Sequence, residues 1–158
     1  MKVTIICVGK LKERFYADAV SEYRKRLSRF SDTEIIELPD ERIPDNANEH
    51  EKEAVKNREG EHILAKIKDN AHIIALCVEG KLLSSEELAA EIKNACMHTS
   101  HIVFIIGGSL GLSEAVKNRA ELRLSFGRMT MPHMLMRVVL AEQIYRSFMI
   151  NAGASYHK

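Results

Sequence analysis

Hydrophobic positions along this chain alternate between short continuous runs and helical spacings. Each short run is rich in Ile, Val and Leu, which favours a strand. Residues 71–78 and 101–106 are apolar almost throughout, as is typical of strands that are covered on both faces of a sheet. The pattern predicts strands at residues 2–8, 33–38, 71–78, 101–106 and 122–126.

Between these runs, apolar residues recur every three or four positions, which is the spacing of one helix face. The first such segment has apolar positions at Phe15, Ala19, Tyr23, Leu27 and Phe30. Ser84 and Glu87 form the capping-box pattern before another segment. Helices are expected at residues 12–30, 49–67, 85–97, 113–120 and 132–150. Alternating strands and helices predict an α/β fold with a largely parallel sheet, in one domain spanning residues 1–158.

The last predicted helix is apolar around most of its circumference, from Met134 through Met149. Such a helix must be buried on more than one side. In a domain of this size the second side is expected to be another subunit, so we predict a homodimer. The alternative is a helix enclosed within one chain.

Composition narrows the class of protein. Hydrophobic residues make up 46% and charged residues 28%, as in soluble globular domains. No apolar run approaches the roughly 20 residues that span a bilayer, and the N-terminus reads as a strand, not a signal peptide. The three cysteines are far apart and no histidines have ligand spacing. We therefore expect a cytoplasmic protein without a membrane segment or a metal site.

The net charge of +1 conceals an asymmetry. Residues 117–158 contain seven lysines and arginines and two acids, for a net charge of +5, and the first 116 residues carry −4. A basic C-terminal third suits a partner such as RNA. The alternative is that these charges are solvated helix faces.

A glycine-rich turn follows the predicted strand 101–106. Gly107, Gly108 and Gly111 allow a ligand to approach the backbone closely. Ligands of open α/β sheets bind at the carboxyl ends of strands, so Gly107 and Gly108 are candidate cofactor-binding residues. The spacing matches neither a dinucleotide fingerprint nor a P-loop.

The same turn reads Gly107-x-Ser109-x-Gly111, which matches the nucleophile elbow of α/β-hydrolases. A serine esterase using Ser109 is therefore an alternative function. An RNA-binding module without catalysis is another. The segment 124–137 offers a second turn, rich in methionine and suited to a flat apolar ligand, followed by His133 and Arg137 one helical turn apart.

The chain resembles the RlmH family of ribosomal RNA large-subunit methyltransferases from end to end. The resemblance is carried by VGKLKE (8–13), AVSEYRKRL (19–27), GEHILAKI (60–67), GKLLSSEELA (80–89), FIIGGSLGL (104–112), LSFGRMTMPHMLMRVVLAEQIYR (124–146) and YHK (156–158). The chain departs from the family before the terminal YHK, where Gly153 is kept but the charged residues that usually follow are absent.

The resemblance implies a SPOUT fold, which is a mostly parallel sheet with helices on both faces and a deep C-terminal trefoil knot, in a homodimer. It implies S-adenosylmethionine as cofactor and N3 of a pseudouridine in the helix-69 loop of 23S rRNA, on the assembled ribosome, as methyl acceptor. The cofactor would contact the positions matching Leu76, Gly107, Phe126, Gly127, Arg128, Met129, Thr130 and Met131.

Methylation of an imide nitrogen requires that its proton leave. From the resemblance, we predict that His157 is the general base that removes this proton, with His133 as the alternative, because imidazole accepts protons near neutral pH. Tyr156 and Lys158 would orient the nucleobase or phosphate of the RNA. Arg137 or Arg146 would stabilise negative charge. Arg146 and Lys158 would bind RNA. The tail that carries these groups is expected to serve the active site of the other subunit.

Overall fold

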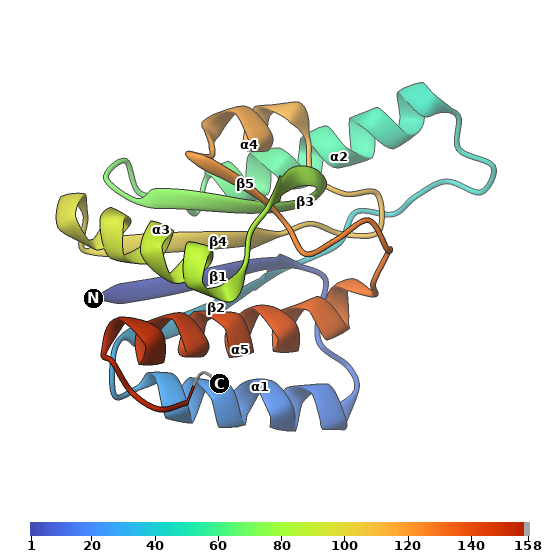
Figure 1. Ribbon diagram of the computed structural model, residues 1–158. Coiled ribbons are helices and arrows are strands. Elements are labelled where there is room, and N and C mark those ends of the chain that lie inside the picture. The colour runs from blue at the N-terminus through green and yellow to red at the C-terminus, as the bar shows by residue number, and fades with distance from the viewer. Residues whose placement is uncertain (157–158) are drawn as a thin grey trace.

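The computed structural model describes residues 1–156 and contains one five-stranded sheet (Figure 1). Every paired strand runs parallel to its neighbour, in the order β2-β1-β4-β3-β5. Each of the five predicted strands is present, which confirms the α/β class. The strands are β1 (Lys2–Val8), β2 (Asp32–Leu38), β3 (His72–Leu82), β4 (His101–Ile106) and β5 (Leu122–Ser125).

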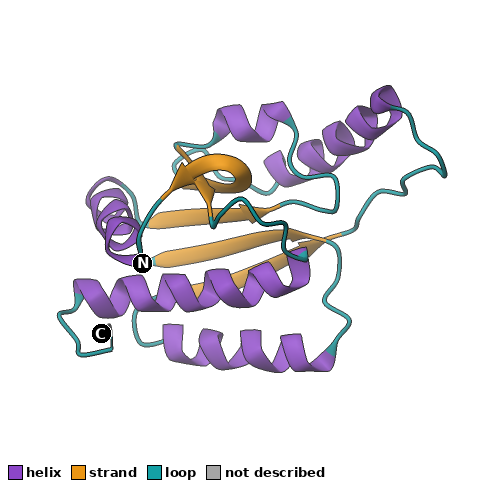
Figure 2. Ribbon diagram, turned by 45° about the vertical axis from the view of Figure 1, so that its right-hand side comes forward, coloured by secondary structure: helices purple, strands orange, loops and turns teal. Residues whose placement is uncertain are grey.

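Helices cover both faces of the sheet, as predicted. They are α1 (Arg14–Leu27), α2 (Glu49–Leu64), α3 (Ser85–His98), α4 (Glu114–Arg119) and α5 (His133–Asn151). Helices α1, α3 and α5 lie on one face, with α5 packed between the other two, and α2 and α4 lie on the opposite face (Figures 1 and 2). None of the described helices is long and apolar enough to cross a membrane.

Strand side chains alternate between two apolar layers because successive residues of a strand point to opposite faces. In β4, Phe104 packs among α1, α3 and α5, while its neighbours Val103 and Ile105 pack against α2 and α4. All six residues of β4 are buried. This explains why the run 101–106 is apolar without interruption.

Strand β3 is longer than the sequence predicts. We expected it to end at Glu79-Gly80, but it continues to Leu82, and Leu124 of β5 pairs with both Leu76 and Lys81. The residues between them curl away from the ladder (Figures 1 and 2). A Cβ at Gly80 would lie 2.7 Å from the Arg123 carbonyl oxygen, so glycine is needed there for contact with the β5 backbone rather than for a turn.

The first helix differs from its prediction at Phe15. This side chain was expected on the buried face, but 65% of its surface is exposed. The helix begins only at Arg14, so Phe15 lies in its first turn, which does not cover this side chain. Leu27 of the same helix is buried, as the apolar spacing predicts, and Val20, which the predicted face did not include, is buried as well.

Candidate functional site

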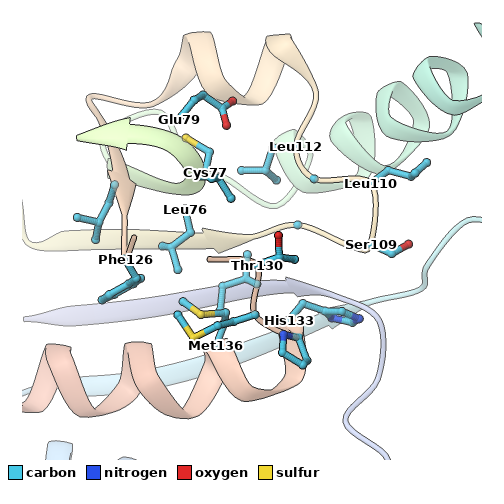
Figure 3. Close-up of a pocket in the computed structure, with 18 of the residues that line it drawn as sticks. Leu76, Cys77, Glu79, Ser109, Leu110, Leu112, Phe126, Thr130, His133 and Met136 are labelled. Carbon is cyan, nitrogen blue, oxygen red and sulfur yellow. The ribbon is translucent and has the colours of Figure 1, made fainter. Parts of the chain in front are cut away.

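A cavity of about 700 Å³ lies at the carboxyl edge of the sheet, where the ends of β3, β4 and β5 meet (Figure 3). Its volume is within the range of small-molecule sites. Its walls come from the curl of β3, the glycine-rich turn after β4, the loop after β5 and the first turn of α5. Parallel strands place their carboxyl ends together, so segments about fifty residues apart in sequence share one cavity.

The glycine-rich turn forms one wall. The Gly111 backbone N–H donates to the Gly108 carbonyl at 3.1 Å, and Gly111 has a positive φ of 83°. A Cβ at Gly107 would lie 2.9 Å from the Gly111 backbone. The turn is therefore too tight for a side chain at Gly107, and the backbone itself faces the cavity.

The loop after β5 forms the opposite wall and is largely apolar. Ser125 fixes the start of this loop. Its hydroxyl donates to the Val78 carbonyl at 2.9 Å, and its Oγ accepts from the Gly127 N–H at 3.2 Å. Gly127 has a φ of 132°, a conformation that other residues rarely adopt. Beyond it, Met129 is 82% exposed at the rim.

One end of the cavity carries a cluster of ion-paired side chains. The Lys117 ammonium lies 2.7 Å from carboxylate oxygens of both Glu79 and Glu114. These hydrogen bonds raise the pKa of Lys117 and lower the pKa of Glu79, so both stay charged at neutral pH. At the same wall, burial raises the pKa of the Cys77 thiol, which keeps it protonated.

His133, at the start of α5, lines the opposite end of the cavity. Its pKa is lowered by burial and then by the neighbouring Arg137 guanidinium, which favours the neutral imidazole. Its Nδ1 is buried and has no hydrogen-bond partner among the described residues. Because Nδ1 is closed to the cavity, a proton taken from a bound molecule would have to reach Nε2 of the neutral ring.

Arg137 is placed differently from the prediction. Its side chain is only 2% exposed; Nη1 donates to Glu37 at 2.9 Å, and Nη2 donates to the carbonyls of Val8 and Gly9 at 3.2 and 2.7 Å. A guanidinium so engaged is not available to negative charge in the cavity. We therefore assign Arg137 to holding the chain after β1 against α5, in place of the predicted contact with substrate.

The described part of the tail packs on the middle of α5. The Tyr156 hydroxyl donates to Glu142 at 3.0 Å, and its ring contacts Tyr145 at a centroid distance of 5.0 Å. Arg146 pairs with the same Glu142 carboxylate at 2.6 Å and lies over the Tyr156 ring at 4.7 Å. Tyr156 and Arg146 thus lie together, but neither lines the cavity.

The structure brings most of the predicted cofactor residues into one place. Eight of the nine candidates line the cavity: Leu76, Gly107, Gly108, Phe126, Gly127, Met129, Thr130 and Met131. Arg128 is exposed and does not line it. Their role as cofactor ligands stays a prediction. His157 and Lys158 lie outside the described residues.

Sequence reasoning missed the charged end of the cavity. Glu79 and Lys117 line it from the curl of β3 and from α4, and Lys56 lines it from α2. No motif marks them, because their proximity depends on how α2 and α4 cross the far face of the sheet. The only sequence signal was Glu79 directly after an apolar strand, a position that parallel sheets place at the ligand edge.

Neither a serine esterase nor a metal site gains support from the structure. Ser109 is exposed on the glycine-rich turn and has no hydrogen bond to a histidine among residues 1–156, so the nucleophile–base pair of an esterase is not formed there (Figure 3). Within the same range, no three His, Cys, Asp or Glu side chains gather closely enough to hold a metal ion.

Comparison with known proteins agrees with this geometry. A family model described as "Predicted SPOUT methyltransferase" matches residues 1–157. A "Ribosomal RNA large subunit methyltransferase H" of Lactobacillus delbrueckii subsp. bulgaricus is 54% identical over 159 residues and covers 100% of both chains. The protein of that name from Lactococcus lactis subsp. cremoris is 55% identical over the same span. A solved structure of a probable methylase family protein from Haemophilus influenzae Rd KW20 aligns with a TM-score of 0.51 and 10% identity over 96% of this chain and 66% of its own, which is a likeness of fold.

Proposed function

The chain belongs to the SPOUT methyltransferases and, within them, to the RlmH family, and from this we propose that it uses S-adenosylmethionine to methylate N3 of a pseudouridine in the helix-69 loop of 23S rRNA. The acceptor would be the assembled ribosome in the cytoplasm. The observation that carries the proposal is the cavity shared by the glycine-rich turn and the loop 126–131.

The cavity suits S-adenosylmethionine in size and chemistry. An adenine ring fits between apolar walls such as Leu76 and Phe126, with the backbone of Gly107 placed to read its polar edge. Glu79 supplies a charged acceptor at the other end. When bound, the cofactor supplies an electrophilic methyl group; the protein's part is to hold the acceptor nitrogen in line with it.

The acceptor proton needs a base, and two candidates remain. His157 is proposed from the family resemblance. His133 is supported by its place on the cavity wall and by its lowered pKa, which leaves the imidazole neutral and able to accept a proton. Arg137 keeps His133 in position, because it joins the same turn of α5 to the carbonyls of Val8 and Gly9.

We also propose that the working unit is a homodimer in which the tail of one subunit serves the cavity of the other. Tyr156 contacts its own chain at Glu142, nine residues beyond His133, or roughly 13 Å along the helix. The tail therefore starts away from its own cavity. Half-exposed Leu135, Val139 and Ile150 lie along α5 at a spacing that suits a partner helix.

The knot and the RNA contacts complete the proposal. The deep trefoil knot is proposed from membership of the SPOUT family alone, because the double pairing of Leu124 with Leu76 and Lys81 is a local register shift in the ladder. Arg146 and Lys158 are proposed to bind RNA near the tail, where Arg146 would exchange part of its contact with Glu142 for a phosphate.

Two measurements test this function. Calorimetric titration with S-adenosylmethionine should show saturable binding at one site per chain. Mass spectrometry of rRNA from cells lacking the protein should show one pseudouridine without its methyl group, restored by the purified enzyme and cofactor. Absence of binding would contradict the proposal, and labelling of Ser109 by a fluorophosphonate would favour the esterase.

A further inference from the structure

An exposed basic and aromatic segment lies directly beside the cavity and has no role in the proposed function. It comprises residues 10–16, which connect β1 to the first turn of α1. Lys10, Lys12, Arg14 and Phe15 are all exposed, and Phe15 contacts Tyr16 at a ring-centroid distance of 4.3 Å. Phe15 is 65% exposed, and it is the exposed aromatic ring of a segment that also carries three cations.

The segment is held firmly against the cavity wall. A Cβ at Gly9 would lie 3.3 Å from the ring of His133, a residue of the cavity wall. Lys10 therefore follows directly after a residue that lies against this wall. The Arg137 guanidinium binds the carbonyl of Gly9, and its partner Glu37 accepts the N–H of Leu11. The exposed side chains therefore project from a backbone that the Arg137–Glu37 pair fixes in place.

The charges of this segment are free to meet an anion. Lys10 and Lys12 have no ion pair or hydrogen bond among the described residues, and Arg14 has only a 3.7 Å contact with Asp18. Glu13 is the one acid in the segment.

Most cations of the basic C-terminal third are engaged. Lys117, Arg119 and Arg146 pair with glutamates, and Arg137 is buried. Arg123 donates to the Lys117 carbonyl and to Asn118, and Arg128 is exposed. Elsewhere in the chain, residues 32–61 contain eleven acids and four bases, which disfavours a polyanion there. Residues 10–16 therefore gather three exposed cations on one approach to the cavity, which suits RNA.

We propose that residues 10–16 form a docking surface for single-stranded RNA, in which Lys10, Lys12 and Arg14 contact phosphates and a base stacks on Phe15. The proposal rests on the proposed function and names the surface that presents the substrate to it. Aromatic side chains among cations are the usual platform for unpaired nucleotides, since every base offers a π-face. Contact with Phe15 would hold a base beside the target nucleotide while the target enters past His133.

The chain contains no tryptophan, so Phe15→Trp introduces a single reporter. Titration with a short single-stranded RNA at low salt should quench its fluorescence, because a base stacks on the indole. Unchanged fluorescence at RNA concentrations that saturate binding would overturn the stacking contact.

Charge is tested with two matched double variants in the full-length protein. Lys10→Ala with Lys12→Ala should weaken binding to ribosomes and reduce the slope of log affinity against log salt by about 0.7 for each phosphate that is no longer bound. Phe15→Ala should weaken binding roughly tenfold. The control is Lys66→Ala with Lys68→Ala, which removes the same charge from the segment after α2 and should leave both quantities unchanged.

The outcomes separate this proposal from the function on which it rests. S-adenosylmethionine affinity should stay at the wild-type value in every variant. If the wild type methylates ribosomes and the Lys10/Lys12 and Phe15 variants bind like the control, the docking surface is wrong and the function stands. If Phe15→Ala instead converts a dimer into monomers by light scattering, the surface is a subunit contact and the RNA proposal fails. If the wild type binds no cofactor, the proposed function fails.

Discussion

The Arg137–Glu37 pair links three parts of the chain through one guanidinium. It joins α5 to the end of β1 and to β2, and it lies next to His133. Burying a charge is costly unless it is paired and hydrogen-bonded, and here two carbonyls and a carboxylate meet that need. Only its Nε is left without a partner among the described residues. The arrangement makes a buried arginine a positioning group for the cavity wall.

Arg137→Met should lower the free energy of unfolding by about 2 to 3 kcal/mol, because two backbone carbonyls lose their donor and Glu37 loses its counter-ion. Urea denaturation measures this. Arg119→Met is the matched control: its ion pair with Glu121 is exposed, so its loss should cost less than about 1 kcal/mol. Equal losses in the two variants would contradict the structural role of Arg137.

His101 gives the protein a pH-dependent stability. Its Nε2 lies 2.8 Å from the Thr4 hydroxyl, and burial, followed by Lys2 and Lys68, lowers its pKa below the ordinary 6.5. As pH falls below about 6.5, the unfolded chain takes up a proton that the folded protein refuses, so stability is lost until the lowered pKa is reached.

Wild type should therefore lose stability between about pH 7 and pH 5, by at most about 1.4 kcal/mol per pH unit from this group. His101→Gln, which keeps a donor near Thr4, should lose less over the same interval. Urea unfolding at both pH values measures the difference between the two proteins. Identical pH dependence in the two would show that His101 does not titrate in this way.

Among the elements, the turn after β4 and the loop after β5 depend on glycine for different reasons. Gly107 lacks room for a Cβ, whereas Gly127 has open space but a positive φ. Both conditions keep backbone, and not side chains, at the cavity surface. The two turns come from strands separated by β3, so the shape of the cavity depends on the sheet holding its register.

Gly107→Ala should reduce S-adenosylmethionine affinity at least tenfold, about 1.4 kcal/mol, because the methyl group forces Gly111 and Leu112 away. Calorimetric titration measures the affinity. Gly153→Ala serves as control: its φ of 67° makes alanine cost about 1 kcal/mol of stability, but it lies beyond α5, away from the cavity. Full affinity in the Gly107 variant would contradict the proposed cofactor site.

For the whole molecule, the outer face of α5 and the tail bear on assembly. Val139→Asp should convert the proposed dimer into monomers, because a charge would be buried at an apolar contact. Light scattering measures the mass. Met97→Asp, at an exposed apolar position on α3, should leave the dimer intact. A dimeric Val139 variant would show that the subunits meet elsewhere.

Deleting residues 156–158 should abolish methylation of ribosomes while S-adenosylmethionine affinity stays close to that of the wild type. The reason is that Tyr156 contacts α5 and not the cavity, so cofactor binding does not need it. A methylation assay and a calorimetric titration measure the two effects. Methylation at the normal rate would show that the tail is dispensable.

Local pattern was sufficient for the elements and for the location of the cavity. Each strand and helix follows from apolar spacing within a few residues, and the Ser84 capping box forms as expected. The carboxyl edge of parallel strands collects loops wherever the chain is α/β, so Gly107 and Phe126 were expected to lie together. The resemblance supplied the family and the cofactor prediction.

Tertiary contacts were needed for the rest. Apolar spacing did not distinguish buried Leu27 from exposed Phe15, because that depends on which turns of the helix the rest of the fold covers. Charge counting did not reveal that Arg137 is buried against Glu37, one hundred residues away, or that Lys117 meets Glu79. Periodicity reports which face of an element is apolar. Which charges meet, and which aromatic ring is left uncovered, depends on long-range packing that no local pattern encodes.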